Sequence, residues 1–110
     1  MTYQHQALAA GRCSHLPLVE QMANVGSEVE RALNWRAKHK ADYAVHAYER
    51  ALELLDLTLM SVRGSARVRE IARVREGMVD YFAGTNLYGS TDAAWRSYFL
   101  PFTVAARKTR

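Results

Sequence analysis

The chain has 110 residues, of which 49% are hydrophobic and 24% are charged, and these values are typical of a single globular domain. No stretch approaches the ~20 apolar residues of a membrane-spanning helix, and the first residues lack the basic start and apolar run of a signal peptide. Cys13 is the single cysteine, which excludes an internal disulfide and a zinc site built from several thiolates of one chain. We therefore expect a cytoplasmic protein without a membrane segment.

The hydrophobic periodicity predicts helices and no strand, so the expected fold class is all-α. Residues 1–15 are mostly polar, and we expect them to form an arm in front of a single domain over residues 16–110. The first predicted helix begins near residue 16 and runs to about Lys38, with Pro17 in its first turn. Gly26 lies on the apolar face of this helix, which indicates that a neighbouring helix approaches closely there.

The longest helix signal covers residues 42–62, and Asp42 is its expected N-cap. The apolar residues of this segment cover close to half of its circumference, whereas an ordinary surface helix needs a stripe of about 100°. We therefore expect it to be the central helix, with neighbours on two sides. The link over residues 38–41 is so short that it forces the first two helices into an antiparallel hairpin.

The third predicted helix covers residues 66–83, with Gly64 ending the helix before it and Ser65 as its cap. Five apolar residues define its buried face: Val68, Ile71, Met78, Val79 and Phe82. The fourth helix follows the loop over residues 84–89. Its expected cap is one of three adjacent polar residues, Ser90, Thr91 or Asp92. The predicted architecture is a four-helix up-down bundle with short loops.

Four ionisable residues recur at every third or fourth position of the second helix, namely His46, Glu49, Glu53 and Asp56. A metal site in a bundle needs side chains that converge on one interior point. This stripe lies opposite the apolar face, so we expect it to face water and predict neither a metal nor a cofactor. The loop between Gly84 and Gly89 lacks the Lys and Ser/Thr of a phosphate-binding loop. No pattern indicates catalytic residues, which favours a protein that is not an enzyme.

Arg36 and Arg75 lie on the apolar faces of the first and third helices. A buried guanidinium without a partner is very costly, so each arginine either pairs with a carboxylate or lies at an opening of the bundle. The paired, structural interpretation is favoured. If the chain holds an anion or nucleotide site, these two residues are the candidates, together with Asn86 and Tyr88 of the loop before the fourth helix.

Trp35 and Leu57 are apolar residues outside the apolar faces of their helices. Tryptophan is enriched in protein–protein contacts. The two residues therefore indicate a self-association surface, and a homo-oligomer, with a dimer favoured, is the expected state.

Positive charge is concentrated in the second half of the chain. Residues 1–62 carry six basic and seven acidic residues, whereas residues 63–110 carry nine basic and four acidic residues. Arginine suits bidentate recognition of phosphate and carboxylate groups. The arginines of the third helix therefore offer an alternative function, nucleic-acid binding, with Arg67, Arg69 and Arg73 as its candidate residues.

The short helical hairpin that contains ADYAVHAYERALELLDL, residues 41–57, followed by two more helices, resembles the HEPN family of small helical bundles. The resemblance implies a four-helix up-down bundle that dimerises, often beside a nucleotidyltransferase-like partner subunit or in a toxin–antitoxin pair. Ribonuclease members of that family carry an arginine followed, after four to six residues, by a histidine. The nearest pair here is Lys40 and His46, so the resemblance implies a binding member without ribonuclease activity.

The sequence thus predicts a non-catalytic binding or regulatory module that self-associates and contacts a protein or nucleotide partner. The alternative is a nucleic-acid-binding or RNA-processing protein that uses the arginine-rich third helix.

Overall fold

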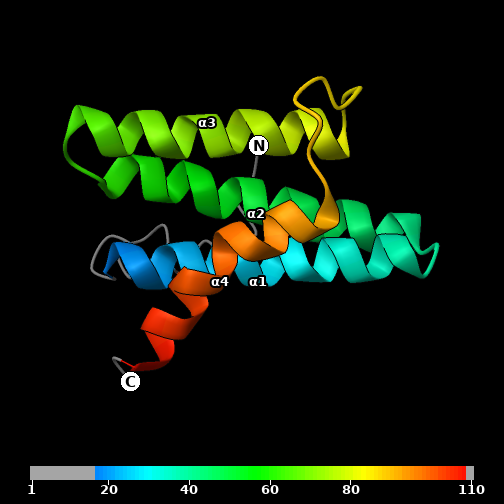
Figure 1. Ribbon diagram of the computed structural model, residues 1–110, viewed down its shortest axis with the longest axis horizontal. Coiled ribbons are helices and arrows are strands. Elements are labelled where there is room, and N and C mark those ends of the chain that lie inside the picture. The colour runs from blue at the N-terminus through cyan, green and yellow to red at the C-terminus, as the bar shows by residue number, and fades with distance from the viewer. Residues whose placement is uncertain (1–16, 109–110) are drawn as a thin grey trace.

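The computed structural model describes residues 17–108 and contains, within them, four helices and no strand (Figure 1). The helices are α1 (Leu18–Ala37), α2 (Ala41–Ser61), α3 (Ser65–Phe82) and α4 (Asp92–Lys108). The predicted all-α fold with four bundled helices is confirmed, and the bounds of the first three helices lie within two residues of the prediction. The arm expected over residues 1–15, with Cys13, lies outside the described residues.

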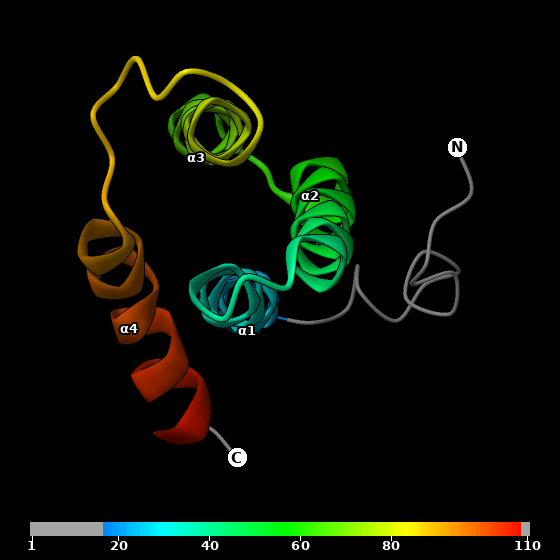
Figure 2. The same cartoon turned by 90° about the vertical axis from the view of Figure 1, so that its right-hand side faces the viewer.

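The helices follow one another in space in the order α3, α2, α1, α4. α1 packs against α2 and α4, whereas α2 packs against α1 and α3. The end-on view in Figure 2 shows α2 beside α3 and α1 beside α4, with the α1–α2 hairpin on one side of the bundle. The expectation that the second helix has neighbours on two sides is confirmed. Because α1 also has two neighbours, the centre of the bundle is the α1–α2 hairpin rather than α2 alone.

Helix α4 crosses α1 obliquely, whereas α1, α2 and α3 lie roughly alongside one another (Figures 1 and 2). The crossing depends on Gly26 of α1, because a Cβ atom at this position would lie 2.9 Å from Cβ of Phe99 in α4. The close approach predicted at Gly26 is confirmed. Phe99 joins the core cluster that fills the bundle, together with Met22, Val29, Leu55 and Ile71.

Two of the predicted helix caps are wrong. Asp42 lies inside the first turn of α2, which begins after Lys40, and the cap position makes no side-chain hydrogen bond. The carboxylate there still favours the helix through the positive end of its dipole. Ser65 is the first residue of α3, and Gly64, with a φ of 95°, occupies the cap. For α4, Thr91 is the cap, since its Oγ1 accepts a hydrogen bond from Ala94 N at 3.0 Å.

Three burial predictions are also wrong. Val68 was expected in the core but is 40% exposed, and the buried residues of α3 are Ile71, Val74, Gly77 and Met78. Glu53 and Leu57, one turn apart on α2, were expected at the surface but are 3% and 6% exposed. Gln21 of α1 is buried as well. The covered part of α2 is therefore wider than its apolar stripe.

Candidate binding groove between α3 and α4

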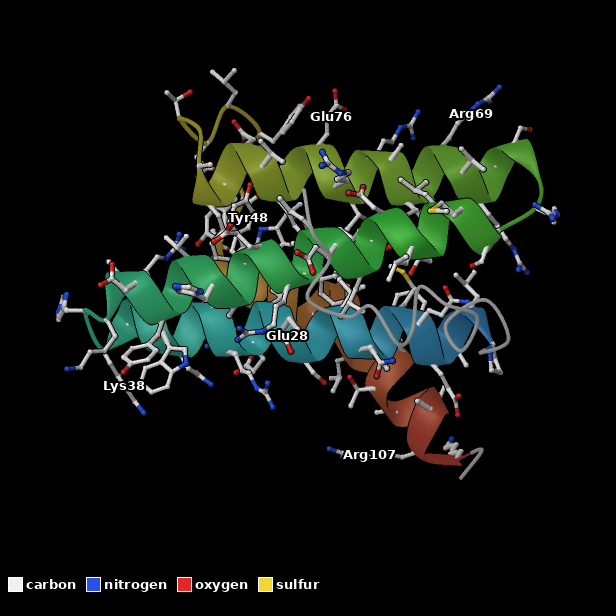
Figure 3. All side chains as sticks on the ribbon, turned by 180° about the vertical axis from the view of Figure 1, so that it is seen from behind. Glu28, Lys38, Tyr48, Arg69, Glu76 and Arg107 are labelled. Atoms are coloured by element: carbon white, nitrogen blue, oxygen red, sulfur yellow. The ribbon has the colours of Figure 1, made fainter. Side chains whose placement is uncertain are left out.

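The arginines of residues 17–108 divide into two groups. Five of them form ion pairs, namely Arg31 and Arg50 with Glu28, Arg36 with Asp92, Arg75 with Asp56, and Arg96 with Glu30. Figure 3 shows Glu28 between α1 and α2. The other arginines of this part of the chain form no ion pair there: Arg63, Arg67, Arg69, Arg73 and Arg107. Four of these lie within eleven consecutive residues, from Arg63 just before α3 to Arg73 within it.

The start of α3 is a poor place for cations on structural grounds. The N-terminus of a helix carries the positive end of its dipole, which is stabilised by acidic residues and destabilised by basic ones. α3 has no acidic residue in its first turn and no side-chain cap. Arg63 before the helix and Arg67 in its first turn therefore add positive charge to a helix end that is already positive, whereas Arg69 and Arg73 lie beyond that turn. Folding does not explain this concentration of charge.

A groove runs between α3 and α4, with a volume of about 650 Å³. Its lining comes from the first half of each helix and from the residue before the α4 cap: Ala66, Arg69, Glu70, Arg73, Val74, Ser90, Ala94, Trp95 and Tyr98. The volume falls within the range of about 300–1,000 Å³ that is usual for ligand sites. Arg69 and Arg73 both line the groove one turn apart, and Arg67 does not. Figure 3 shows Arg69 extending from α3 away from α2.

The apolar part of the groove is formed by Trp95 of α4 and Val74 of α3, which are 8% and 7% exposed. Trp95 reaches α3 at Gly77, where an added Cβ atom would lie 3.2 Å from Cη2 of the indole ring. The indole Nε1–H is buried and has no hydrogen-bond partner among the described residues. Burial of a donor without a partner costs free energy.

A single polar contact bridges the groove. The Tyr98 hydroxyl donates a hydrogen bond to Oε2 of Glu70 at 2.8 Å. Burial raises the pKa of Tyr98, and the hydrogen bond to Glu70 raises it further. Tyr98 therefore stays protonated at neutral pH, and Glu70 keeps its contact across the groove rather than pairing with the adjacent Arg69 or with Arg73.

The four residues predicted for an anion site do not form one site. Arg36 donates a hydrogen bond to Asp92 Oδ1 at 3.0 Å, and its guanidinium lies 4.5 Å from the ring centre of Tyr81. Tyr81 also donates a short hydrogen bond to Asp92. This hydrogen bond and the Arg36 charge lower the pKa of Asp92, although burial opposes them. Arg36 thus joins the end of α1 to α3 and α4.

Arg75 and Tyr88 line a second hollow of about 430 Å³, on α3 and the loop that follows it. Arg75 Nε donates to Asp56 Oδ1 at 2.8 Å, so its charge is matched. Asn86 has a positive φ of 58° and exchanges two hydrogen bonds with Ser90, which fix the loop rather than a ligand. The structure brings Arg75 and Tyr88 together, and it places Arg36 elsewhere.

Asp80 is a structural residue that the sequence interpretation missed. Its carboxylate accepts hydrogen bonds from the backbone N–H groups of Leu87 and Tyr88, at 2.7 and 3.1 Å. An Asp near a helix end, followed by a glycine-containing loop, is the signal that could have indicated this role. The loop is held firmly although Leu87 and Tyr88 are 86% and 64% exposed.

The two residues predicted for self-association lie in different environments. Leu57 is buried, so the expectation that it lies on an exposed surface is wrong. Trp35 is partly buried and stacks on Tyr43, with ring centres 4.8 Å apart, beside the α1–α2 turn. Tyr43 is 58% exposed. Self-association through Trp35 stays a prediction.

In the described part of the chain, no group of three or more His, Cys, Asp or Glu side chains is placed to hold a metal ion. Residues 17–108 also contain no helix of the length and apolarity needed to cross a membrane. The chain matches no protein-family model, no curated protein and no solved structure. The resemblance to the HEPN family, with the dimer and the nucleotidyltransferase-like partner that it implies, therefore stays a prediction.

Proposed function

We propose that this protein is a non-catalytic binding module whose groove between α3 and α4 receives an anionic segment of a macromolecular partner. The observation that carries the proposal is the pair Arg69 and Arg73, which line an apolar groove without forming an ion pair in residues 17–108. Arginine presents a planar fork of donors that matches carboxylate and phosphate groups.

Energetics supports a binding role for these arginines. Ion pairs at the surface of a protein contribute only about 0–1 kcal/mol to its stability. Arg69 and Arg73 are exposed and lack even that small gain within the described residues. Their guanidinium groups therefore have donors to offer to an anion that another molecule supplies.

The titratable groups of the groove support binding rather than catalysis. General acid–base chemistry needs a group whose pKa lies near the operating pH. The pKa of Tyr98 is raised, away from neutrality, mainly by burial. Glu70 is engaged by the Tyr98 hydroxyl. The groove offers hydrogen-bond donors and apolar surface, which are the elements of recognition.

The experiment that tests this proposal is site-specific photocrosslinking in living cells of the source organism. Ala94 is exposed and lines the groove, so p-benzoylphenylalanine at position 94 would contact an occupant directly. The matched control is the same substitution at Ala37, which is also exposed and helical but does not line the groove. We expect a crosslinked macromolecule from position 94 only.

Dependence on charge completes the test. In the Arg69→Ser/Arg73→Ser background, the crosslink from position 94 should be lost, whereas in an Arg63→Ser/Arg67→Ser background it should persist. Both pairs remove two unpaired arginines from the same stretch, but one pair alone lines the groove. Equal crosslinking from positions 94 and 37, or none from position 94, would overturn the proposal.

Nucleic-acid binding is the second candidate function, and the cluster of four unpaired arginines between Arg63 and Arg73 favours it. Neutralising four phosphates of a single strand predicts that log K falls with log salt at a slope of about −2.8. Titration of a 20-nucleotide RNA at several salt concentrations measures this slope. A weak affinity with a slope near zero would count against this function.

A further inference from the structure

We infer that the occupant of the groove is an acidic amphipathic helix of a partner protein. This inference rests on the function proposed above and names the class of partner. The groove fits such a helix in its shape, in the spacing of its charges and in its apolar lining.

The order of the helices leaves room for another helix beside the groove. α3 and α4 are the outer helices, and in the described residues each packs extensively against one neighbour, α2 and α1 respectively. Figure 2 shows that the two outer helices face each other across the side of the molecule that the α1–α2 hairpin does not fill. A hollow between two helices is a common docking site for a third, which lays its apolar face into the groove.

The spacing of the charges matches a helix. Arg69 and Arg73 are four residues apart, so their Cα atoms are separated by about 6 Å along α3. Acidic residues four positions apart on a docked helix have the same spacing. Two successive turns on one face of the docked helix can therefore supply one carboxylate for each guanidinium.

The floor of the groove supplies the apolar contact. Trp95 and Val74 are its buried apolar residues, and Ala66 and Ala94, which also line it, are exposed and small. Apolar side chains of an amphipathic helix recur at positions i, i+3, i+4 and i+7 on one face. Such a helix would place one or two of them over Trp95 and its acidic residues against Arg69 and Arg73.

The same residues disfavour a nucleic acid in the groove. Binding of a single strand combines phosphate contacts with bases stacked on exposed aromatic rings. Trp95 is 8% exposed and Tyr98 is held by Glu70, so neither ring is a free stacking surface. The groove itself supplies two arginines, which are few for the successive phosphates of a strand but match two acidic residues on one face of a helix. A helix with a short apolar stripe beside two acidic residues therefore fits better than a nucleic-acid strand.

The experiment is a peptide-display selection against the full chain. The library presents 18-residue helical peptides without tryptophan, with variable residues on one face. After counter-selection against the Arg69→Ser/Arg73→Ser variant, we expect peptides with apolar residues at i, i+3 or i+4 and i+7, flanked by Asp or Glu. Their affinity should fall about tenfold or more in the Arg69→Ser/Arg73→Ser variant and less than about threefold in the Arg63→Ser/Arg67→Ser variant.

Fluorescence locates the bound peptide. The chain has two tryptophans, so a Trp35→Phe variant leaves Trp95 as the sole reporter at the floor of the groove. Binding of a selected peptide should shift the Trp95 emission, and circular dichroism should show that every variant keeps its helix content. The inference would be overturned if no peptide were enriched or if the enriched peptides had no acidic residues. It would also be overturned if both double variants lost the same peptide affinity, or if the Trp95 emission did not change on binding. A groove-specific crosslink to nucleic acid would overturn the inference and leave the proposed binding function standing, whereas no groove-specific crosslink would overturn that function.

Discussion

Helices α1 and α3 have similar lengths and similar amphipathic patterns, and they differ in how much of their surface other helices cover. Nine of the twenty residues of α1 are buried, and both of its arginines form ion pairs. Four of the eighteen residues of α3 are buried, and three of its four arginines are unpaired within residues 17–108. The arginines of α1 thus take part in the ion pairs of the bundle, whereas most of those of α3 form no ion pair in the described residues.

The largest effect is expected from glycine substitutions at the two contacts of α4. Gly26→Ala should destabilise the protein by about 2–3 kcal/mol, because the new methyl group meets Phe99 in the closed contact between α1 and α4. Gly77→Ala should change stability by less than about 1 kcal/mol, since Trp95 borders an open groove and alanine favours the helix. Urea unfolding followed by circular dichroism measures both. Equal destabilisation would mean that the α3–α4 side is packed as tightly as the α1–α4 side.

Arginine removal tests the same comparison through charge. Arg50→Ser should cost about 1–2 kcal/mol, because it deprives the buried Glu28 carboxylate of a partner at 3.0 Å. The Arg69→Ser/Arg73→Ser variant should unfold within about 0.5 kcal/mol of the wild-type protein. Both are measured by denaturant unfolding at one salt concentration. A loss above about 1 kcal/mol in the double variant would show that these arginines stabilise the fold after all.

The stability that Asp92 contributes at the junction of α1, α3 and α4 should depend on pH. The lowered pKa of Asp92 means that its contribution to stability is present above about pH 4, the ordinary range of an aspartate, and is lost as the pH falls through the lowered value. Asp92→Asn should remove this part of the acid dependence and cost less than about 1 kcal/mol at pH 7, since the pair is partly exposed. Thermal unfolding between about pH 2 and pH 7 compares the two proteins. Identical profiles would contradict the role given to Asp92.

The last prediction concerns Trp35 beside the α1–α2 turn. Trp35→Ala removes the stacking contact with Tyr43, which is worth about 0.5–1.5 kcal/mol, and the helix content should be unchanged. If Trp35 mediates self-association, native mass spectrometry at low salt will show a smaller species for the variant than for the wild-type protein. An unchanged mass would contradict self-association through Trp35 and leave α3 as the main candidate surface for contact with a partner.

The sequence predicts the helices well because their periodicity and breaks are local properties. Gly26 was recognised as a contact point because it interrupts an apolar face. Glu53 and Leu57 were misplaced because a helical wheel shows the chemistry of a face and not which helices cover it. Val68 was misplaced because the buried face of α3 follows Ile71, Val74 and Met78 instead.

The groove could be predicted only in part. Arg69 and Arg73 were identified by composition, but their position beside Trp95 depends on the angle at which α4 crosses α1, and no local pattern encodes that angle. The same holds for Arg36, whose carboxylate partner Asp92 is 56 positions away along the chain. When the two residues of an ion pair are far apart in the sequence, the folded structure is needed to identify them, because their spacing along the chain carries no signal.

Asp80 fixes the loop that joins α3 to α4, so the α3–α4 side of the molecule is closed by this loop at one end. The loop ties the end of α3 to the start of α4, while the oblique course of α4 carries its far end away from α3 (Figure 1). The two helices thus diverge from the loop onward, and α4 lies nearer to α3 at the loop than at its far end (Figure 1). The two ends of the α3–α4 side of the molecule therefore differ, and a segment that bound there would meet the loop at one end only.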